Sequence, residues 1–450
     1  MGILSLKKSH DYQANATEIN LLLAQARSKG FATAGEDFVK KLPDADNAWI
    51  EIAPILMKQE NGKRGKYIYT NEYASSLIAS GQLSDETIIQ ESLDLNRTDR
   101  EMILKALKSK RGFQIPRNYN EGYAMLYPDL ARLKVLANDL CLDALSHAMY
   151  RDSAGTLSRL DAAYLLGSEL MLQKDDLSRL VGLSIFSIVS RLNLRIVEVD
   201  PSMIGLIKDR AKTWAPKFEQ DPFETFEWYF LEQMAMCRNF DDPILDRPRL
   251  GFPLDKIFEP ADTKAFDEAS RIRPSNAIPK SPAMRRYMVS LLRQWLPAIV
   301  QIQNPATKHD ASTADAIAAK VDWSVDCPWP LKDLLSSLLE GTVSVSGQYS
   351  VQTKIDLLFE AIRQVEYKQT HGKYSNHVLG LIRVSDPSTK FTVTKRGNGI
   401  QIGAGPLNDE GLAQTRICIP VSAGLSMKNT EPSNISRLRN GTLKVSGKKS

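Results

Sequence analysis

Cysteine and histidine are scarce in this chain, and their spacing excludes the common metal and redox sites. The 450 residues include four cysteines and five histidines. The cysteines form no CxxC pair, which excludes zinc-ribbon and thioredoxin-type spacings, and so few of them argue against a disulfide framework. They are Cys141, Cys237, Cys327 and Cys418. We therefore predict no disulfide scaffold and no cofactor.

Long apolar runs and common catalytic motifs are also missing. The most apolar run, residues 180–189, has about half the roughly 18 residues of a membrane span, so we predict a helix buried on all sides. No secretory signal is visible near the start of the sequence. GxSxG, HExxH and nucleotide-binding glycine patterns are absent, and the glycines near residue 400 suit a hairpin better. We expect a cytoplasmic protein, or a cell-envelope protein if an amino-terminal anchor is missing from the chain.

Charge is nearly balanced over most of the chain. The net charge is +5, from 58 basic and 53 acidic residues. Residues 421–450 hold six basic residues and one acidic residue, which accounts for the whole excess. A body-wide basic face for nucleic acid is therefore not expected. Membrane association is expected only through this basic tail or through a missing anchor.

Helical periodicity dominates up to about residue 366. Near the amino terminus we predict a helix over 16–28 and one from about residue 44, with a kink or early stop at Pro54. Thr98 and Glu101 have the spacing of a capping box that opens a further helix. Later helices are expected over 284–303, interrupted at Pro297, and near 331–339 and 351–366.

The clearest helical region lies between residues 123 and 214. One stripe of its first helix is apolar and includes Leu133, Leu140 and Cys141. Further helices begin near residues 157 and 175, and Asp-Pro pairs at 200–201 and 221–222 indicate two more starts. Short connections between helices of this length favour antiparallel αα-hairpins.

A small sheet is indicated near the carboxyl end. The segments 391–394, 399–403 and 416–421 alternate and contain β-branched residues, and RGNG between the first two favours a hairpin turn. We predict a small antiparallel sheet of two or three strands, which must pack on the helices because it is too small to be stable alone.

These patterns together predict a mainly α fold. Antiparallel helical hairpins would form a repeat-like, TPR-like array, and a small antiparallel β module would follow at the carboxyl end. The expected organisation is a flexible amino terminus (1–13), a helical-hairpin domain (14–240), a proline-rich connection (241–282), a second helical segment (283–384), a β-hairpin module (385–422) and a disordered basic tail (423–450).

Candidate catalytic carboxylates lie on the aromatic-rich helix over 222–236. They are Glu224, Glu227 and Glu232. A carboxylate against aromatic rings can have a raised pKa and act as a general acid, although a glycosidase also needs a second carboxyl group across a cleft. The alternative is a solvated helix face, or pairing with an arginine such as Arg238.

Candidate metal ligands are the two histidines that bracket the turn HGKYSNH, His371 and His377. Their six-residue separation is not the i,i+4 spacing of a helical zinc pair. A third histidine, His147, lies on the same helical stripe as Cys141. We predict that it is a hydrogen-bonded histidine at the end of a core stripe rather than a ligand.

Three stretches carry a family resemblance. They are LLLAQARSKGFATAGEDFVKKLPDADNAWIEIAPIL, the helical region from LARLKVLANDLCLDALSHAMY to DDLSRLVGLSIFSIV, and GNGIQIGAGPLNDEG followed by TRICIPV. With these the chain resembles a group of uncharacterised helical proteins from planctomycete-like and related bacteria. Its ending is similar to pseudopilin tails.

The resemblance implies a TPR-like helical body with a small β module and no established activity. Relatives in the group usually begin with a membrane anchor, whereas this chain has MGILSLKKSHDYQ in that place. In the pseudopilin-like loop the acidic positions are reduced to Asp409 and Glu410, which does not favour a calcium site.

We predict a non-enzymatic helical scaffold or a protein that binds another protein or peptide. The alternative is a hydrolase, directed at a glycan, that uses a carboxylate on the 222–236 helix. A continuous groove lined by aromatic and charged side chains would favour the first prediction. A deep cleft with two carboxylates would favour the second.

Overall fold

The structure is a computed structural model, and it describes most of the helical body and the sheet. The described residues are 2–57, 93–94, 96–125, 127–214, 222–239, 277–304, 316–317, 320–322, 324–328, 332, 349–380, 391–407 and 413–419. Outside these ranges lie most of the proline-rich connection, residues 409 and 410, the basic tail and, apart from residue 332, the helix predicted near 331–339.

The fold is mainly helical with a small antiparallel sheet, as predicted. The helices are α1 (Gly2–Ser28), α2 (Gly35–Phe38), α3 (Ala48–Met57), α6 (Arg97–Ser109), the 3-10 helix η2 (Tyr119–Ala124), α7 (Leu130–Met149), α8 (Ser153–Met171), α9 (Asp176–Val199), α10 (Met203–Trp214), α11 (Pro222–Asn239), α13 (Pro282–Ile302) and α16 (Tyr349–His371). The strands are β1 (Phe391–Arg396), β2 (Gly399–Leu407) and β3 (Ala413–Ile419).

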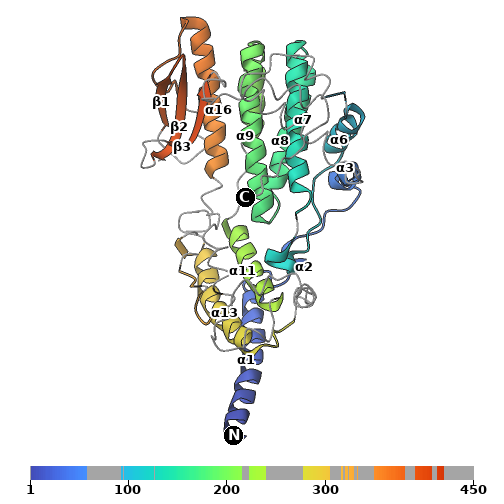
Figure 1. The fold of residues 1–450 in the computed structure, drawn as a ribbon, viewed down its shortest axis with the longest axis vertical. Helices are drawn as coiled ribbons and strands as arrows, with labels where there is room; N and C mark the ends of the chain where they lie inside the picture. The colour runs from blue at the N-terminus through green and yellow to red at the C-terminus, as the bar shows by residue number, and fades with distance from the viewer. Residues whose placement is uncertain are drawn as a thin grey trace, which may run out of the picture.

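The helices α7, α8 and α9 form the centre of an upper group (Figure 1). Each of the two connections between them is only a few residues long, so neighbouring helices are antiparallel. Aspartates begin the later two helices: Asp152 accepts a hydrogen bond from the backbone N–H of Gly155, and Asp175 accepts one from Ser178. The predicted apolar stripe, including Leu133, lies in the core.

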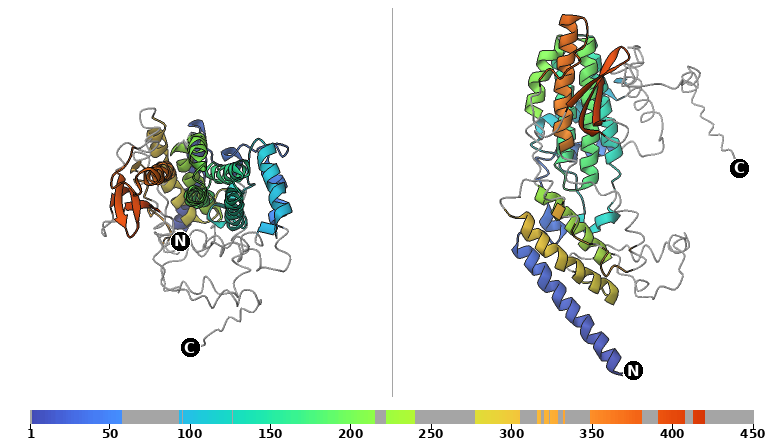
Figure 2. Two further views of the ribbon diagram at one scale, coloured as in Figure 1. Left: turned by 90° about the horizontal axis from the view of Figure 1, so that it is seen from above. Right: turned by 90° about the vertical axis from the view of Figure 1, so that its left-hand side faces the viewer.

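A lower group contains α1, α11 and α13, which share a second apolar core (Figures 1 and 2). Its largest side chains include Phe226, Phe230 and Trp295, and both phenylalanine rings meet the indole edge to face. A smaller cluster, centred on Trp228, connects α11 with α2 and η2. It therefore lies where the lower group meets the segment that leads into α7.

The sheet has the strand order β1-β2-β3 and is antiparallel throughout. Arg396 pairs with Gly399 across a two-residue turn, in which Gly397 has a φ of +55°. The buried side chains of Ile402 and Ile419 join the same core as α9 and α16. The sheet thus packs on the helices, as its small size requires.

Several predicted helix boundaries differ from those in the structure. Residues 2–13, predicted to be flexible, belong to α1. The capping box of Thr98 and Glu101 is wrong, because α6 begins at Arg97 and the Glu101 carboxylate pairs instead with Arg159 at 2.6 Å. The short connection before α8 makes residue 153, not 157, its first residue.

Neither internal proline ends its helix. Pro54 lies within α3 and Pro297 within α13, and both helices continue beyond them. Each proline is exposed, and so are Ile50 and Arg293, the residues four positions earlier whose carbonyls lose a hydrogen-bond donor. The loss therefore falls on the solvent side, where water replaces the missing bond.

The apolar helix α9 is not buried on all sides, so that prediction is wrong. Leu177, Leu180 and Val199 are 48%, 38% and 41% exposed, and they share one helix face with the exposed Arg191. In the described part of the chain, α9 is long and apolar enough to cross a membrane. A core helix of a soluble protein passes the same test, and 56% of the most apolar stretch of α9 is buried inside the protein.

The close approach of α8 and α9 depends on Gly182. A Cβ atom at this position would lie 2.8 Å from the carbonyl oxygen of Gly167 and 3.1 Å from the backbone nitrogen of Met171. We expect Gly182→Ala to lower the free energy of unfolding by about 1–3 kcal/mol, because the two helices must separate. This loss outweighs the roughly 1 kcal/mol by which alanine favours a helix over glycine.

Gly205 in α10 offers a matched control, since a Cβ there would meet no atom within 4 Å. Gly205→Ala should leave stability unchanged or raise it by up to about 1 kcal/mol. Urea unfolding of the two variants measures the difference. Equal stabilities would show that the contact between α8 and α9 tolerates a methyl group.

Candidate functional site

Of the three glutamates predicted on α11, Glu227 and Glu232 have described side chains, and these have different surroundings. Glu227 accepts a hydrogen bond from the backbone N–H of Ala32, with 2.5 Å between oxygen and nitrogen. Glu232, half-buried, contributes with burial and with Asp175 to raising the pKa of Tyr127. The side chain of Glu224 lies outside the described part. One oxygen of Glu227 thus has a structural role, fixing the segment after α1 to α11.

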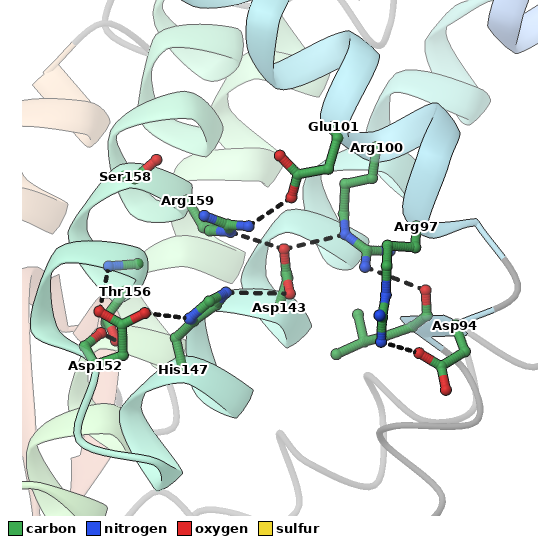
Figure 3. Close-up of polar contacts among 12 residues, drawn as sticks. Asp94, Arg97, Arg100, Glu101, Asp143, His147, Asp152, Thr156, Ser158 and Arg159 are labelled. Carbon is green, nitrogen blue, oxygen red and sulfur yellow. Dashed lines mark hydrogen bonds and ion pairs between the residues drawn. The ribbon is translucent and has the colours of Figure 1, made fainter.

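A buried ionic cluster connects α6, α7 and α8 (Figure 3). The carboxylate of Asp143 on α7 pairs with Arg100 of α6 at 3.1 Å and with Arg159 of α8 at 2.8 Å. Arg159 also pairs with Glu101, which returns the network to α6. Every charge in this group is directed at another helix, so the cluster holds the three helices together.

His147 completes the cluster and is hydrogen-bonded, as predicted. Its Nδ1 lies 2.8 Å from Asp152 Oδ2, and its Nε2 lies 3.8 Å from Asp143 Oδ1 (Figure 3). The backbone N–H of Gly155 and the imidazole together lower the pKa of Asp152. A Cβ at Gly155 would overlap both the imidazole and the Asp152 carboxylate. The histidine therefore closes the turn between α7 and α8.

A second polar network lies between the upper and lower groups. Arg117 makes two hydrogen bonds to Asp129, of 2.7 and 2.8 Å, and both side chains are almost fully buried. Burial raises the pKa of Asp175 and that of Asp176 at the start of α9, against the opposing effect of nearby arginines. Asp176 also pairs with Arg179 at 3.8 Å. Arg179 in turn donates to the carbonyl of Gln173 at 2.9 Å, so these charged groups fix the start of α9 to the segment before it.

One cavity between α3, α6 and α7 is too small for a ligand. Its lining includes Leu56, Arg100, Arg132 and Leu136, and its volume is about 20 Å³. A space of that size accommodates one water molecule.

A larger groove opens between the end of α16 and the β1–β2 hairpin. Its volume is about 580 Å³. We call it the cationic groove, and it is lined by Tyr367, Lys368, Gly372, Lys373, Tyr374, Ser375, Asn376, His377, Lys395, Gly397, Asn398, Gly399 and Ile400. It lies at the end of α16 away from α11 and α13 (Figure 1). Its size is that of sites that hold a small ligand or a few residues of a peptide.

Buried side chains of α16 fix one wall of the groove. Gln364 donates to the carbonyl of His377 at 2.8 Å and accepts from the backbone N–H of Ser375 at 3.0 Å. Glu360 accepts from the backbone N–H of Leu379 at 2.8 Å and from Gln364. Burial raises the pKa of Glu360. The loop after α16 is thus held by hydrogen bonds to the helix.

The lining has one sign of charge. It contains three lysines and His377 but no aspartate or glutamate. Lys368, Lys373 and Lys395 are all exposed, and the Lys368 ammonium lies 4.5 Å from the centre of the Tyr374 ring. Burial raises the pKa of Tyr374, so its hydroxyl stays neutral. The groove therefore combines positive charge with two half-buried aromatic rings, and it suits an anionic ligand.

The two histidines proposed as metal ligands have different surroundings. His371 stacks on Tyr367 with 3.9 Å between ring centres, and its Nδ1 lies 3.0 Å from the carbonyl oxygen of Tyr367. His377 lies at the groove. Within the described residues, no group of three or more histidine, cysteine, aspartate or glutamate side chains is placed to hold a metal ion.

Comparison with known proteins gives no family. No protein-family model, no curated protein and no solved structure matches the chain. The lysines of the cationic groove were not predicted as site residues. Lys368 and Lys373 flank the predicted histidine turn and Lys395 precedes the hairpin turn, so each lies beside a predicted feature. Only the packing of the hairpin against α16 brings the two segments together.

Proposed function

We propose that the protein is a non-enzymatic binding protein and that the cationic groove holds an acidic segment of another protein. One observation carries the proposal: three lysines and two tyrosines line a groove that has no carboxylate in its lining. The sequence-based hypothesis of a peptide-binding protein is favoured by a continuous groove lined by aromatic and charged side chains, and the lysines and half-buried tyrosines of this groove are of that kind.

The physical basis is a combination of weak contacts. An exposed pair between a lysine and a carboxylate contributes only about 0.2–1 kcal/mol, so a single pair would not hold a partner. Three lysines around one groove act together and also speed the encounter with an acidic partner. Tyr367 and Tyr374 add apolar contact area, and tyrosine is among the residues enriched at binding hot spots.

The proposal does not depend on the predicted TPR-like array. The helices α7, α8 and α9 all contact one another, as in a bundle, and the groove lies beside them rather than on the concave face of a stack. An array of helical repeats stays a prediction. The hydrolase alternative has less support, because the described Glu227 carboxylate binds the backbone of Ala32 and neither Glu227 nor Glu232 lines the cationic groove.

The test is the binding of a fluorescein-labelled polyglutamate decapeptide, followed by fluorescence anisotropy. We expect the wild-type protein to bind it, and to bind more weakly as the ionic strength rises from about 0.05 M to about 0.5 M. A triple variant, Lys368→Gln with Lys373→Gln and Lys395→Gln, should bind at least about tenfold more weakly, a change of ~1.4 kcal/mol.

The matched control removes the same charge elsewhere. Lys105, Lys134 and Lys320 are exposed and lie outside the groove, so changing all three to glutamine should alter the affinity by less than about twofold. Equal losses in the two triple variants would mean general attraction to a basic protein and would overturn the proposal. So would a wild-type protein that does not bind the peptide.

A further inference from the structure

The first strand of the sheet, β1, is an edge strand that ends at the cationic groove. β1 is at one edge of the sheet, with β2 on one side and no strand on the other in the part of the chain that the structure describes. An edge strand presents unpaired backbone N–H and C=O groups, which are a template for a strand from another chain. β1 ends at Lys395 and Arg396, and Lys395 lines the groove.

The hairpin register shows which backbone groups of β1 face outward. Arg396 and Gly399 close a two-residue turn, so they form a pair that exchanges backbone hydrogen bonds. Along an antiparallel pair such residues alternate with residues whose backbone groups point away from the partner strand. The N–H and C=O groups of Phe391, Val393 and Lys395 therefore point away from β2.

The same alternation places the side chains. Phe391 and Val393 are half-buried and pack on the core, whereas Thr392 and Thr394 are exposed. Lys395 shares the face of Phe391 and Val393, because residues two apart in a strand lie on one side of the sheet. The sheet packs on α16 through β2 and β3. Lys368 of α16 and Tyr374 of the loop that follows it form the other side of the groove.

We infer that the partner segment binds in an extended conformation, as an additional strand on β1, with an acidic side chain beside Lys395 directed into the cationic groove. The inference rests on the proposed function and specifies the form of its ligand. A side chain directly opposite Lys395 in an added strand would lie about 4.5–5.5 Å from it, Cβ to Cβ, within reach of an ion pair. Backbone hydrogen bonds to β1 would supply affinity, and the lysines would select an acidic sequence.

The charge of the edge also decides between possible occupants. A lysine on an edge strand opposes pairing with other basic strands and is a known protection against self-association. A second copy of this chain would bring its own Lys395 and Arg396 to the same edge. An acidic strand from a partner neutralises these charges, so we commit to that occupant.

The test uses two isomers of one labelled decapeptide in which glutamate and valine alternate. In one isomer the backbone nitrogens of the glutamates are methylated, and in the other those of the valines. Each modification removes the N–H donors from only one edge of an extended peptide. Strand addition predicts that one isomer binds at least about tenfold more weakly than the unmethylated peptide, while the other binds within about threefold of it.

The protein itself is unchanged in this comparison, so misfolding cannot affect the result. On the protein side, Val393→Pro removes an outward N–H from β1 and should weaken binding of the alternating peptide by at least about tenfold. The proposed function is tested separately, by the loss of polyglutamate binding in the triple lysine variant. Equal affinities of the two methylated isomers would overturn strand addition. If the lysine variants then still behaved as expected, the proposed function would stand; if they did not, both would fail.

Discussion

Replacing Asp143 by alanine should lower the free energy of unfolding by about 3–5 kcal/mol. Asp143 is 7% exposed, and its carboxylate is the counter-charge for Arg100, which is 4% exposed. Without the carboxylate, a guanidinium would stay buried with no ion partner in the cluster. Removing one member of a buried pair is strongly destabilising for this reason, although the intact pair adds little net stability.

The control for Asp143 is an ion pair at the surface. Asp94 and Arg97 form an ion pair with each other, and their side chains are 58% and 67% exposed. Asp94→Ala should therefore change the free energy of unfolding by less than about 0.5 kcal/mol. A double variant, Asp143→Leu with Arg100→Met, should recover part of the loss, because no unpaired buried charge from Arg100 remains. Urea unfolding at neutral pH measures all three. A loss for Asp143→Ala no larger than for Asp94→Ala would contradict the structural role of the cluster.

The buried ionic cluster also shows what the sequence could and could not predict. Helix positions follow from local signals: an apolar stripe of period 3.6 indicates α8, and the aspartates at 175 and 176 indicate the start of α9. The pairing of Arg100 with Asp143, 43 residues later, depends on how α6 packs against α7. Thr98 and Glu101 have the spacing of a cap, but a tertiary ion pair with Arg159 occupies the glutamate instead.

For the candidate site, too, the local structure could be predicted from the sequence and the tertiary packing could not. The β1–β2 hairpin and its turn could be predicted, because RGNG between two alternating segments is a local signal. The groove could not, because it forms between residues 367–377 and 395–400 only after the hairpin packs on α16. The glutamates of α11 were predicted to be catalytic because aromatic residues lie beside them in the sequence. Their helix in fact packs those aromatic rings into two cores, and Glu227 faces a backbone N–H.

Replacing Trp228 by alanine should also lower the free energy of unfolding by about 3–5 kcal/mol. Its indole is 2% exposed, with its ring centre 6.0 Å from that of Phe38 and 5.4 Å from that of Tyr119. Truncation would leave a cavity where α11 meets α2 and η2. Because η2 leads into α7, the same contact joins the lower group of helices to the upper one.

The Trp228 variant should therefore lose hydrogen-exchange protection unevenly along the chain. Hydrogen exchange of the variant should show larger losses of protection in α1, α11 and α13 than in α7, α8 and α9, because α11 contributes Trp228 and Leu231 to this cluster, whereas α7, α8 and α9 contribute no residue to it. Tyr150→Ala is the control, since that ring is 62% exposed and its removal should change stability by less than about 0.5 kcal/mol. If the Trp228 variant instead lost protection equally in both groups, the two would unfold as one cooperative unit, and Trp228 would stabilise the whole molecule rather than the junction.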